Sequence, residues 1–268
     1  MKALFIGGDH PRHRYYFDRM RSLVDLQGSI IQGREHMRPM APHWIERRDQ
    51  MNWDRHFYER DEAERAAFGE PPMMQGTRLK LPDVNTAQAA AFVRERDPEL
   101  VLIFGTGMIK EPLLSALPAE SYNLHLGISP RYRGAATLFW PQYFLEPQFA
   151  GCTFHRIVPE PDAGDILHQC RPMMRKDDGI HDISARAVTV AAGHMAALIA
   201  GKNQGVEWAL KRQKNTGKCF LASDFQPQHL RLIYDVYDNH IAGAYLDGEI
   251  ESKAPQLYTE VYDACISL

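Results

Sequence analysis

The most strand-like stretch of the sequence reads LVLIFGTG, residues 100–107. Five consecutive apolar residues that end in a Gly-Thr-Gly turn are typical of a buried parallel strand opening into a tight loop. Residues 3–6 form a second apolar run that ends in Gly7-Gly8, and Pro11 suits the first turn of a following helix. A strand over 29–32 then completes a β-α-β unit, whose crossover is right-handed. The sequence therefore predicts an α/β fold with parallel strands.

Further elements follow from similar patterns. Residues 34–80 are polar and rich in Met and Arg, and they are expected to form an inserted helical excursion with a helix over 49–68 that stops at Gly69. Asn85 is placed to cap a helix over 86–96, and a short helix is expected around 111–117. The remaining expected elements are strands at 122–125, 151–158 and 166–171 and a long apolar-faced helix over 180–200.

The last part of the chain is less regular. Leu246-Asp247-Gly248-Glu249 lies between alternating residues, which is a signal of a β-hairpin. We expect residues 206–268 to form a small α+β appendage that contains this hairpin, beside a main domain of residues 1–205. The appendage is expected either to pack on the main domain or to contribute to a homodimer contact.

The composition excludes several classes of protein. With 268 residues, 44% hydrophobic and 24% charged, the chain can bury a core, which excludes disorder as its main state. A net charge of −3 gives no global field for a polyanion, so a nucleic-acid partner is disfavoured. No apolar run reaches the roughly 18 residues of a membrane helix, and the start is too short for a signal peptide. We therefore expect a soluble, cytoplasmic protein without membrane association.

The four cysteines lie far apart and form no C-x-x-C pair, which disfavours a disulfide framework or a thiolate zinc site. Free buried thiols are expected at Cys152, Cys170, Cys219 and Cys265.

Three polar side chains stand where a predicted strand gives way to a loop: Asn123, His125 and Asp162. Residues i and i+2 of an extended segment share a face, so Asn123 and His125 can point into one crevice at the end of the sheet. A carboxamide donates to a developing oxyanion, an imidazole relays protons near neutral pH, and a carboxylate beside it orients the ring. From spacing alone the alternative is a capping Asn, a half-buried His and a turn Asp.

Four pieces of sequence surround these residues in a specific order: PELVLIFGTG at 98–107, NLHLGISPRYRG at 123–134, GCTFH at 151–155 and DAGDI at 162–166. Together they resemble the folate-dependent formyltransferases, which include glycinamide ribonucleotide transformylase, methionyl-tRNA formyltransferase and the amino-sugar N-formyltransferases. The resemblance extends over about residues 1–200. It implies a Rossmann-like, mostly parallel sheet flanked by helices, and an enzyme that passes the formyl group of 10-formyltetrahydrofolate to a primary amine without a metal.

The resemblance also implies roles for particular residues. Asn123, His125 and Asp162 fall on the family's catalytic triad, in which the amide stabilises the tetrahedral oxyanion, the imidazole moves protons, and the carboxylate holds the imidazole or a water in register. Family contacts to folate come largely from backbone groups, which map by position onto Gly107, Met108, Ile109, Ile157, Val158 and Pro159.

The chain departs from the family's usual pattern in three places. Gly127 stands where many members have a serine two residues after the histidine, which puts a proton-relay role for that hydroxyl in doubt. The N-terminal turn over 7–13 and the excursion over 34–80 also differ, so acceptor specificity could reside in them.

Other charged residues are candidates for metal ligands or anion contacts. Asp9, His10 and His13 precede Pro and Arg in a turn, and the side chains of Asp162, Asp165 and His168 diverge along a strand, so neither set is expected to bind a metal. His10, Arg131 and Arg133 are predicted to contact the substrate, because guanidinium groups grip phosphate through paired hydrogen bonds. Solvated surface charge is the alternative for each.

These observations favour an N-formyltransferase for a small-molecule amine, with a nucleotide-linked amino sugar as the preferred acceptor. The tail is too small, and not basic, for the tRNA-holding domain of a methionyl-tRNA formyltransferase, and the turn over 7–10 differs from the phosphate loop of glycinamide ribonucleotide transformylases. The alternatives that stay open are a formyltransferase for one of those two amines, a folate-dependent formyl hydrolase with water as acceptor, and a non-catalytic folate-binding module.

Overall fold

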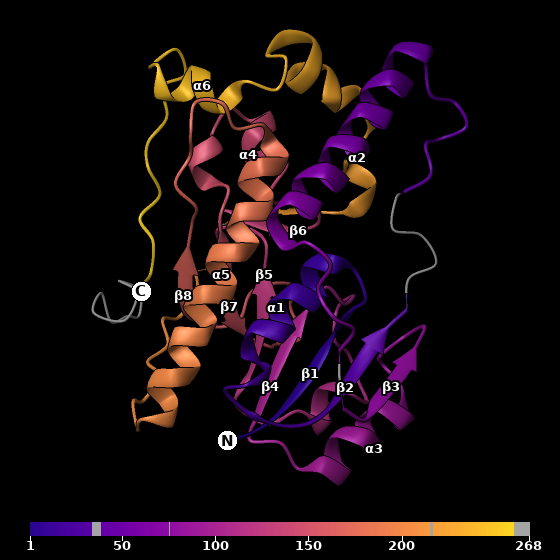
Figure 1. The fold of residues 1–268 in the computed structure, drawn as a ribbon, viewed down its shortest axis with the longest axis vertical. Helices are drawn as coiled ribbons and strands as arrows, with labels where there is room; N and C mark the ends of the chain where they lie inside the picture. The colour runs from indigo at the N-terminus through magenta and orange to yellow at the C-terminus, as the bar shows by residue number, and fades with distance from the viewer. Residues whose placement is uncertain (34–38, 75, 215–216, 260–268) are drawn as a thin grey trace.

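A seven-stranded, mostly parallel sheet forms the centre of the protein (Figure 1). The computed structural model describes residues 1–33, 39–74, 76–214 and 217–259. The strand order is β3-β2-β1-β4-β5-β7-β8, and the first five strands in this order are parallel while β7 and β8 are antiparallel to their neighbours. The strands are β1 (Lys2–Gly8), β2 (Asp25–Gln32), β3 (Arg78–Leu81), β4 (Leu100–Phe104), β5 (Ser121–His125), β7 (Cys152–Arg156) and β8 (Ile166–Cys170). The predicted α/β fold with a Rossmann-like sheet flanked by helices is thus confirmed.

Helices cover both faces of this sheet. The long helix α5 (Ile180–Asn203) packs against α1 (Pro11–Arg21) and α2 (Arg47–Phe68) on one face. The short helix α3 (Ala87–Arg96) and the 3-10 turn η1 (Leu114–Ala116) pack together on the other. Alternate residues of the central strands divide between the layers: Phe5 and Leu102 pack toward α1 and α5, and Leu4 and Val101 pack toward α3. This is the expected layering of a sheet that is buried on both faces.

Helix α5 is long and apolar enough, by length and composition alone, to cross a membrane. Half of its most apolar stretch is buried inside the protein, and residues such as Ala191 and Met195 are fully enclosed against the sheet. This is the pattern of a core helix.

Helix α2, the segment between β5 and β7 and the C-terminal region lie above the carboxyl end of the sheet (Figure 1). The strand β6 (Tyr132–Gly134) pairs in parallel with β9 (Lys218–Phe220), and a second apolar cluster joins α2 to the C-terminal region. The remaining elements are α4 (Trp140–Tyr143), η2 (Pro147–Phe149), η3 (Ala222–Asp224), η4 (Pro227–His229), η5 (Leu232–Val236) and α6 (Ile241–Leu246). The proposed boundary between domains 1–205 and 206–268 stays a prediction.

The predicted C-terminal hairpin is wrong. The residues before the Asp-Gly pair form α6, whose Ile241 and Ala242 are buried, and Gly248, at φ 80°, ends the helical segment instead of joining two strands. The Asp-Gly turn signal does not distinguish these two uses, because a left-handed glycine also closes helices.

Other local expectations need smaller corrections. Thr86, not Asn85, caps α3, because its hydroxyl accepts the amide of Ala89 at 3.2 Å. Cys219 is exposed, while Cys152 and Cys170 are buried as expected and Cys265 lies outside the described residues. The edge strand β3 was not anticipated, since its sequence RLKL is short and half polar.

The loop that carries Asp162 lies directly against β7. A Cβ at Gly164 would stand 1.8 Å from the carbonyl oxygen of Arg156, so only glycine allows this approach. The amide of Arg156 donates to Asp165 at 2.9 Å, and the Gln213 side chain donates to the Asp162 carbonyl at 3.0 Å. These contacts fix where the Asp162 carboxylate points.

We predict that Gly164→Ala displaces this loop and destabilises the protein by about 1–3 kcal/mol, the usual range for overpacking. The matched control is Gly193→Ala: a Cβ at this exposed position of α5 meets nothing within 4 Å, so the change should stabilise the helix by about 0.5–1 kcal/mol. Urea unfolding of both variants measures the difference. Equal stabilities of Gly164→Ala and the unaltered protein would show that the loop is not held as described.

Candidate active site

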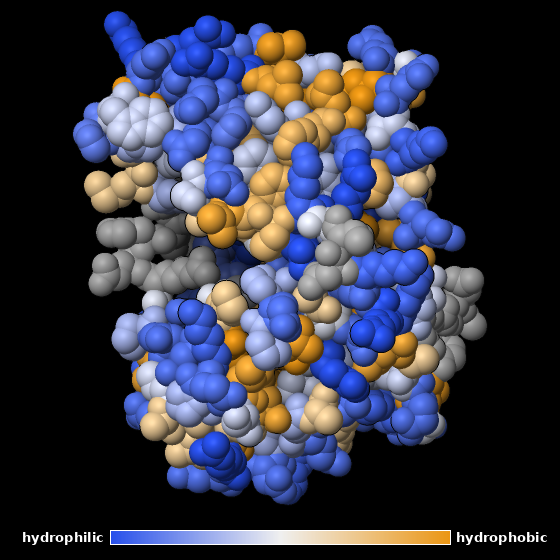
Figure 2. Space-filling model, turned by 180° about the vertical axis from the view of Figure 1, so that it is seen from behind, coloured by the Kyte–Doolittle hydropathy of each residue, from blue (hydrophilic) through white to orange (hydrophobic). Residues whose placement is uncertain are grey.

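A cavity of about 870 Å³ opens at the carboxyl ends of β4 and β5. Its walls come from the loop after β4, from β5, from the segment between β7 and β8, and from α2 and α5. Figure 2 shows the surface hollowed between the half that holds the sheet and the half that holds α2 and the C-terminal region. Ligands of open α/β sheets bind at this edge, so the fold places the cavity where chemistry is expected.

The structure brings Asn123, His125 and Asp162 together in this cavity. Asn123 and His125 lie two apart on β5, and Asp162 adopts a left-handed turn conformation, with φ 47°, in the loop between β7 and β8. The Nδ1 atom of His125 lies 3.3 Å from Oδ2 of Asp162. The Asp162 carboxylate also accepts the backbone amide of Gly134 at 2.8 Å. The shared face of Asn123 and His125 that their spacing predicts is therefore present, and Asp162 meets them there, while the catalytic roles stay a prediction.

His155, which the sequence reasoning did not single out, connects the other two members. Its Nε2 lies 3.2 Å from the Asn123 amide nitrogen and 3.2 Å from Oδ1 of Asp162. Its Nδ1 donates to the carbonyl of Arg156 at 3.0 Å, which fixes the ring. Only the register between β5 and β7 places His155 in the site, because Asn123 and His155 are direct partners between these strands. The sequence alone does not supply that register.

The electrostatics of the pair suit proton transfer. Burial lowers the pKa of His125 despite the nearby Asp162 carboxylate, so the ring is neutral at rest. Burial alone would raise the pKa of Asp162, but the positive charge that His125 carries when protonated, together with His155 and the Gly134 amide, outweighs burial and holds that pKa well below its usual range. The Nε2–H of His125 donates to the carbonyl of Tyr132 at 2.9 Å, so Nδ1 is the atom left to take a proton, beside an ionised carboxylate.

Gly127 makes this orientation of His125 possible. A Cβ at position 127 would stand 2.5 Å from Nε2 of His125 and 2.9 Å from the Tyr132 carbonyl oxygen that this nitrogen contacts. The absence of a side chain at position 127 is thus tied to how the ring is held. Thr153 supports the same loop, because its hydroxyl donates to the Gly127 carbonyl at 2.7 Å.

Most of the residues predicted to contact folate lie along one side of the cavity. Gly107, Met108, Ile109, Ile157 and Val158 line it, and Pro159 does not. Asn85 fixes the first of these segments from behind, since its side chain donates to the Met108 carbonyl at 3.0 Å and accepts the Lys110 amide at 2.7 Å.

The three residues predicted to contact the substrate do not line the cavity. Nδ1 of His10 lies 3.1 Å from Glu64, which does line it. Arg131 pairs with Glu146, and Arg133 reaches the backbone carbonyls of residues 161 and 217 at 3.4 Å. Their proposed contact with a substrate stays a prediction.

A polar wall that the sequence reasoning missed lines part of the cavity. His56, Arg60 and Glu64 recur every four residues on α2 and line the cavity with Arg12 of α1 and His181 of α5. Arg12 forms an ion pair with Glu64, and Nδ1 of His56 lies 3.2 Å from Nε2 of His181. The four-residue spacing of these α2 side chains within the inserted helical excursion was the sequence pattern that could have indicated this wall.

The two wall histidines are held neutral. Burial lowers the pKa of His56 to about 3, with Arg60 adding to the effect, and burial also lowers the pKa of His181 well below its usual value. Both rings therefore act as neutral hydrogen-bonding groups at physiological pH.

Comparisons with known proteins agree with this geometry. A family model described as Formyl transferase matches residues 59–199. A sugar N-formyltransferase from Shewanella sp FDAARGOS_354 superimposes with a TM-score of 0.52 at 17% identity, covering 84% of this chain and 78% of that one. A phosphoribosylglycinamide formyltransferase from Anaplasma phagocytophilum gives 0.54 at 14% identity, covering 82% and 97%. The sugar 3N-formyl transferase WlaRD, solved in the presence of dTDP and 5-N-formyl-THF, gives 0.51 at 14% identity, covering 84% and 71%. At these identities the likeness is one of fold.

We predict that the neutral wall histidines make the protein acid-sensitive. Their folded pKa values lie below the unfolded value of 6.5, so the unfolded chain takes up protons first and stability falls as the pH drops below about 6.5. Between pH 7.5 and 5.5 each histidine should cost about 1 kcal/mol of unfolding free energy. His56→Gln should remove its share of this decline, whereas His240→Gln, at an exposed position, should not. An unchanged decline in His56→Gln contradicts the assignment.

Proposed function

The chain belongs to the formyl transferase family, and we propose on this premise that it transfers a formyl group from 10-formyltetrahydrofolate to the primary amine of a small molecule. The observation that carries the proposal is the meeting of Asn123, His125 and Asp162 in one cavity, with Nδ1 of His125 3.3 Å from Oδ2 of Asp162. The preferred acceptor is a nucleotide-linked amino sugar.

The reaction follows from these three side chains. A neutral amine attacks the formyl carbon, and the Asn123 amide donates to the oxygen that becomes negative. The amine nitrogen loses a proton to Nδ1 of His125, and the Asp162 carboxylate stabilises the imidazolium that forms. Collapse of the tetrahedral intermediate breaks the bond between carbon and N10 of the folate, and the proton passes to N10. The products are a formamide and tetrahydrofolate.

The two substrates are assigned to opposite sides of the cavity. The folate side is formed by the segments 107–109 and 157–158, whose backbone groups offer hydrogen bonds to a planar heterocycle. The acceptor side is formed by α1, α2 and the start of α5. A volume of about 870 Å³ lies in the range of ligand cavities and has room for both substrates around the triad.

The charged wall supports an acceptor that carries phosphate. Arg12 and Arg60 line this side; Arg12 pairs with Glu64, which also lines the cavity, and Arg60 pairs with Asp61, which does not. Guanidinium groups bind phosphate through paired hydrogen bonds, and the carboxylate can hold a sugar hydroxyl or the amine. A nucleotide-linked amino sugar offers all three groups. WlaRD, which shares this fold, was solved in the presence of dTDP.

We predict that Asn123→Ala, His125→Ala and Asp162→Ala each reduce formyl transfer strongly. Loss of an oxyanion donor costs about 10²–10³-fold in kcat, and loss of a general base about 10²–10⁴-fold. Release of tetrahydrofolate from 10-formyltetrahydrofolate in the presence of an amine acceptor measures the rate, and circular dichroism checks the fold. Near-normal rates in all three variants would defeat the proposed function.

A separate prediction concerns the acceptor. Arg60→Gln should raise the KM for the acceptor about tenfold or more while leaving the KM for the folate nearly unchanged, because a charged hydrogen bond contributes about 1.5–3 kcal/mol. The matched control is Arg65→Gln on the same helix, since Arg65 is exposed and lies outside the cavity lining. A rise in the folate KM instead would reverse the assignment of the two sides.

A further inference from the structure

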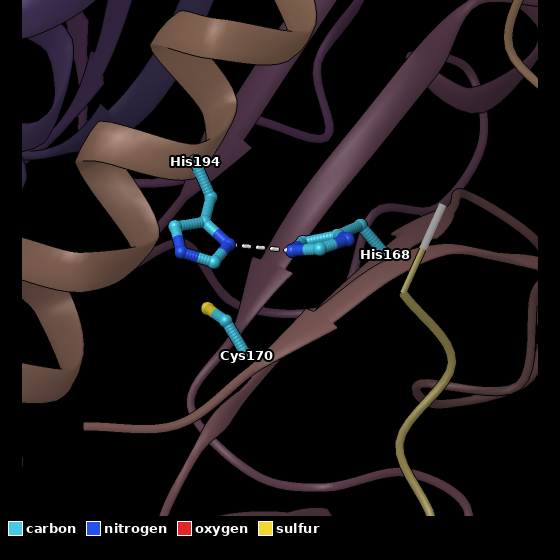
Figure 3. A group of neighbouring side chains, drawn as sticks. All are labelled: His168, Cys170 and His194. Atoms are coloured by element: carbon cyan, nitrogen blue, oxygen red, sulfur yellow. Dashed lines mark hydrogen bonds between the residues drawn. The ribbon is translucent and has the colours of Figure 1, made fainter. Parts of the chain in front are cut away.

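Two histidines and a cysteine meet where β8 packs against α5 (Figure 3). His168 and Cys170 lie two apart on β8 and therefore share one face of the strand, and His194 reaches them from α5. Nε2 of His168 lies 2.6 Å from Nδ1 of His194, and the ligand atoms of all three residues lie within 4.8 Å of one another. None of the three lines the catalytic cavity.

Because their surroundings are apolar, burying these polar side chains costs free energy unless the side chains have a function. His168 is fully buried and Cys170 is 3% exposed, within an apolar cluster that includes Leu167, Ala191 and Met195. Aliphatic side chains would fill this space without the cost of burying an imidazole. His194 is only partly buried, so an ion can reach the group from solvent.

We propose that His168, Cys170 and His194 bind a divalent transition-metal ion, with Zn²⁺ the best match to two imidazoles and a thiolate. The thiol proton of Cys170 leaves to solvent as the Zn–S bond forms. Imidazole nitrogens on a tetrahedral zinc lie about 3.3 Å apart. The two nitrogens must therefore separate by about 0.7 Å from their present 2.6 Å, which a small rotation of the partly exposed His194 provides.

A second thiol stands beside this group. Cys152 is the direct partner of Cys170 between β7 and β8, and its Sγ contacts the Ala187 carbonyl of α5 at 3.6 Å, so it lies on the same face. Either this thiol or a water completes a tetrahedral site. A metal here ties β8 to α5, and also ties β7 if Cys152 is the fourth ligand; β7 and β8 flank the loop that carries Asp162. The site is therefore structural and lies outside the formyl-transfer chemistry.

The test uses the full chain, freed of metal with a chelator and then titrated with Zn²⁺ or Co²⁺ alone. We expect about one bound Zn²⁺ per chain by elemental analysis, a higher unfolding temperature with Zn²⁺, and a thiolate-to-cobalt charge-transfer band in the near ultraviolet with Co²⁺. His194→Gln should weaken Zn²⁺ binding at least tenfold, and Cys170→Ser should abolish the cobalt band. Cys152→Ser distinguishes a second thiolate from a water as the fourth ligand.

His240→Gln, at an exposed position outside the group, is the control for loss of a histidine. Cys170→Ser changes little in volume and keeps the test decisive if His194→Gln fails to fold. Absence of Zn²⁺ binding by the folded protein, or equal binding by folded Cys170→Ser, would overturn the proposal and leave a hydrogen-bonded histidine pair. The measurement needs neither folate nor acceptor, so its failure is distinguishable from failure of the proposed function.

Discussion

The contact between the Asp162 carboxylate and the His125 ring is the interaction on which the site depends. The carboxylate lies in a loop and the ring on a central strand, so their meeting requires the loop to be held closely against β7. This restraint comes from the left-handed conformation of Asp162, the absence of a side chain at Gly164 and the hydrogen bond from the Gly134 amide. The ionised carboxylate in turn favours protonation of the imidazole, which burial otherwise keeps neutral.

The opposite side of the cavity is built by parts of the chain that are far apart in sequence. Helix α2 is held to the C-terminal region by Arg231, whose guanidinium bonds both Asp49 oxygens at 2.7 Å, and by Asn239, which donates to Glu59 at 2.8 Å. His56 on the same helix lies 3.1 Å from the hydroxyl of Tyr234. The C-terminal region therefore positions the α2 wall. On the proposed function, chemistry resides in the sheet and acceptor selection in this second layer.

Local patterns in the sequence predicted the central strands, the long helix α5 and the shared face of Asn123 and His125, because these depend on apolar runs, on helical periodicity or on the two-residue repeat of a strand. That Asp162 joins them was implied by the resemblance to the formyltransferases. What escaped prediction depends on tertiary packing. His155 joins the site through strand register, and the Asp-Gly pair near the C-terminus closes a helix. The sequence alone also does not show that Arg131 pairs with Glu146, so that its guanidinium group does not line the cavity.

The central claim is that this cavity moves a formyl carbon from a folate to an amine. The most direct measurement follows ¹³C in the formyl group of 10-formyltetrahydrofolate by NMR while nucleotide-linked amino sugars are supplied one at a time. The account predicts a formamide carbon signal with one of these acceptors and its disappearance in Asp162→Asn. Label that ends in formate with every amine tested, or a formamide that forms equally fast in Asp162→Asn, would contradict it.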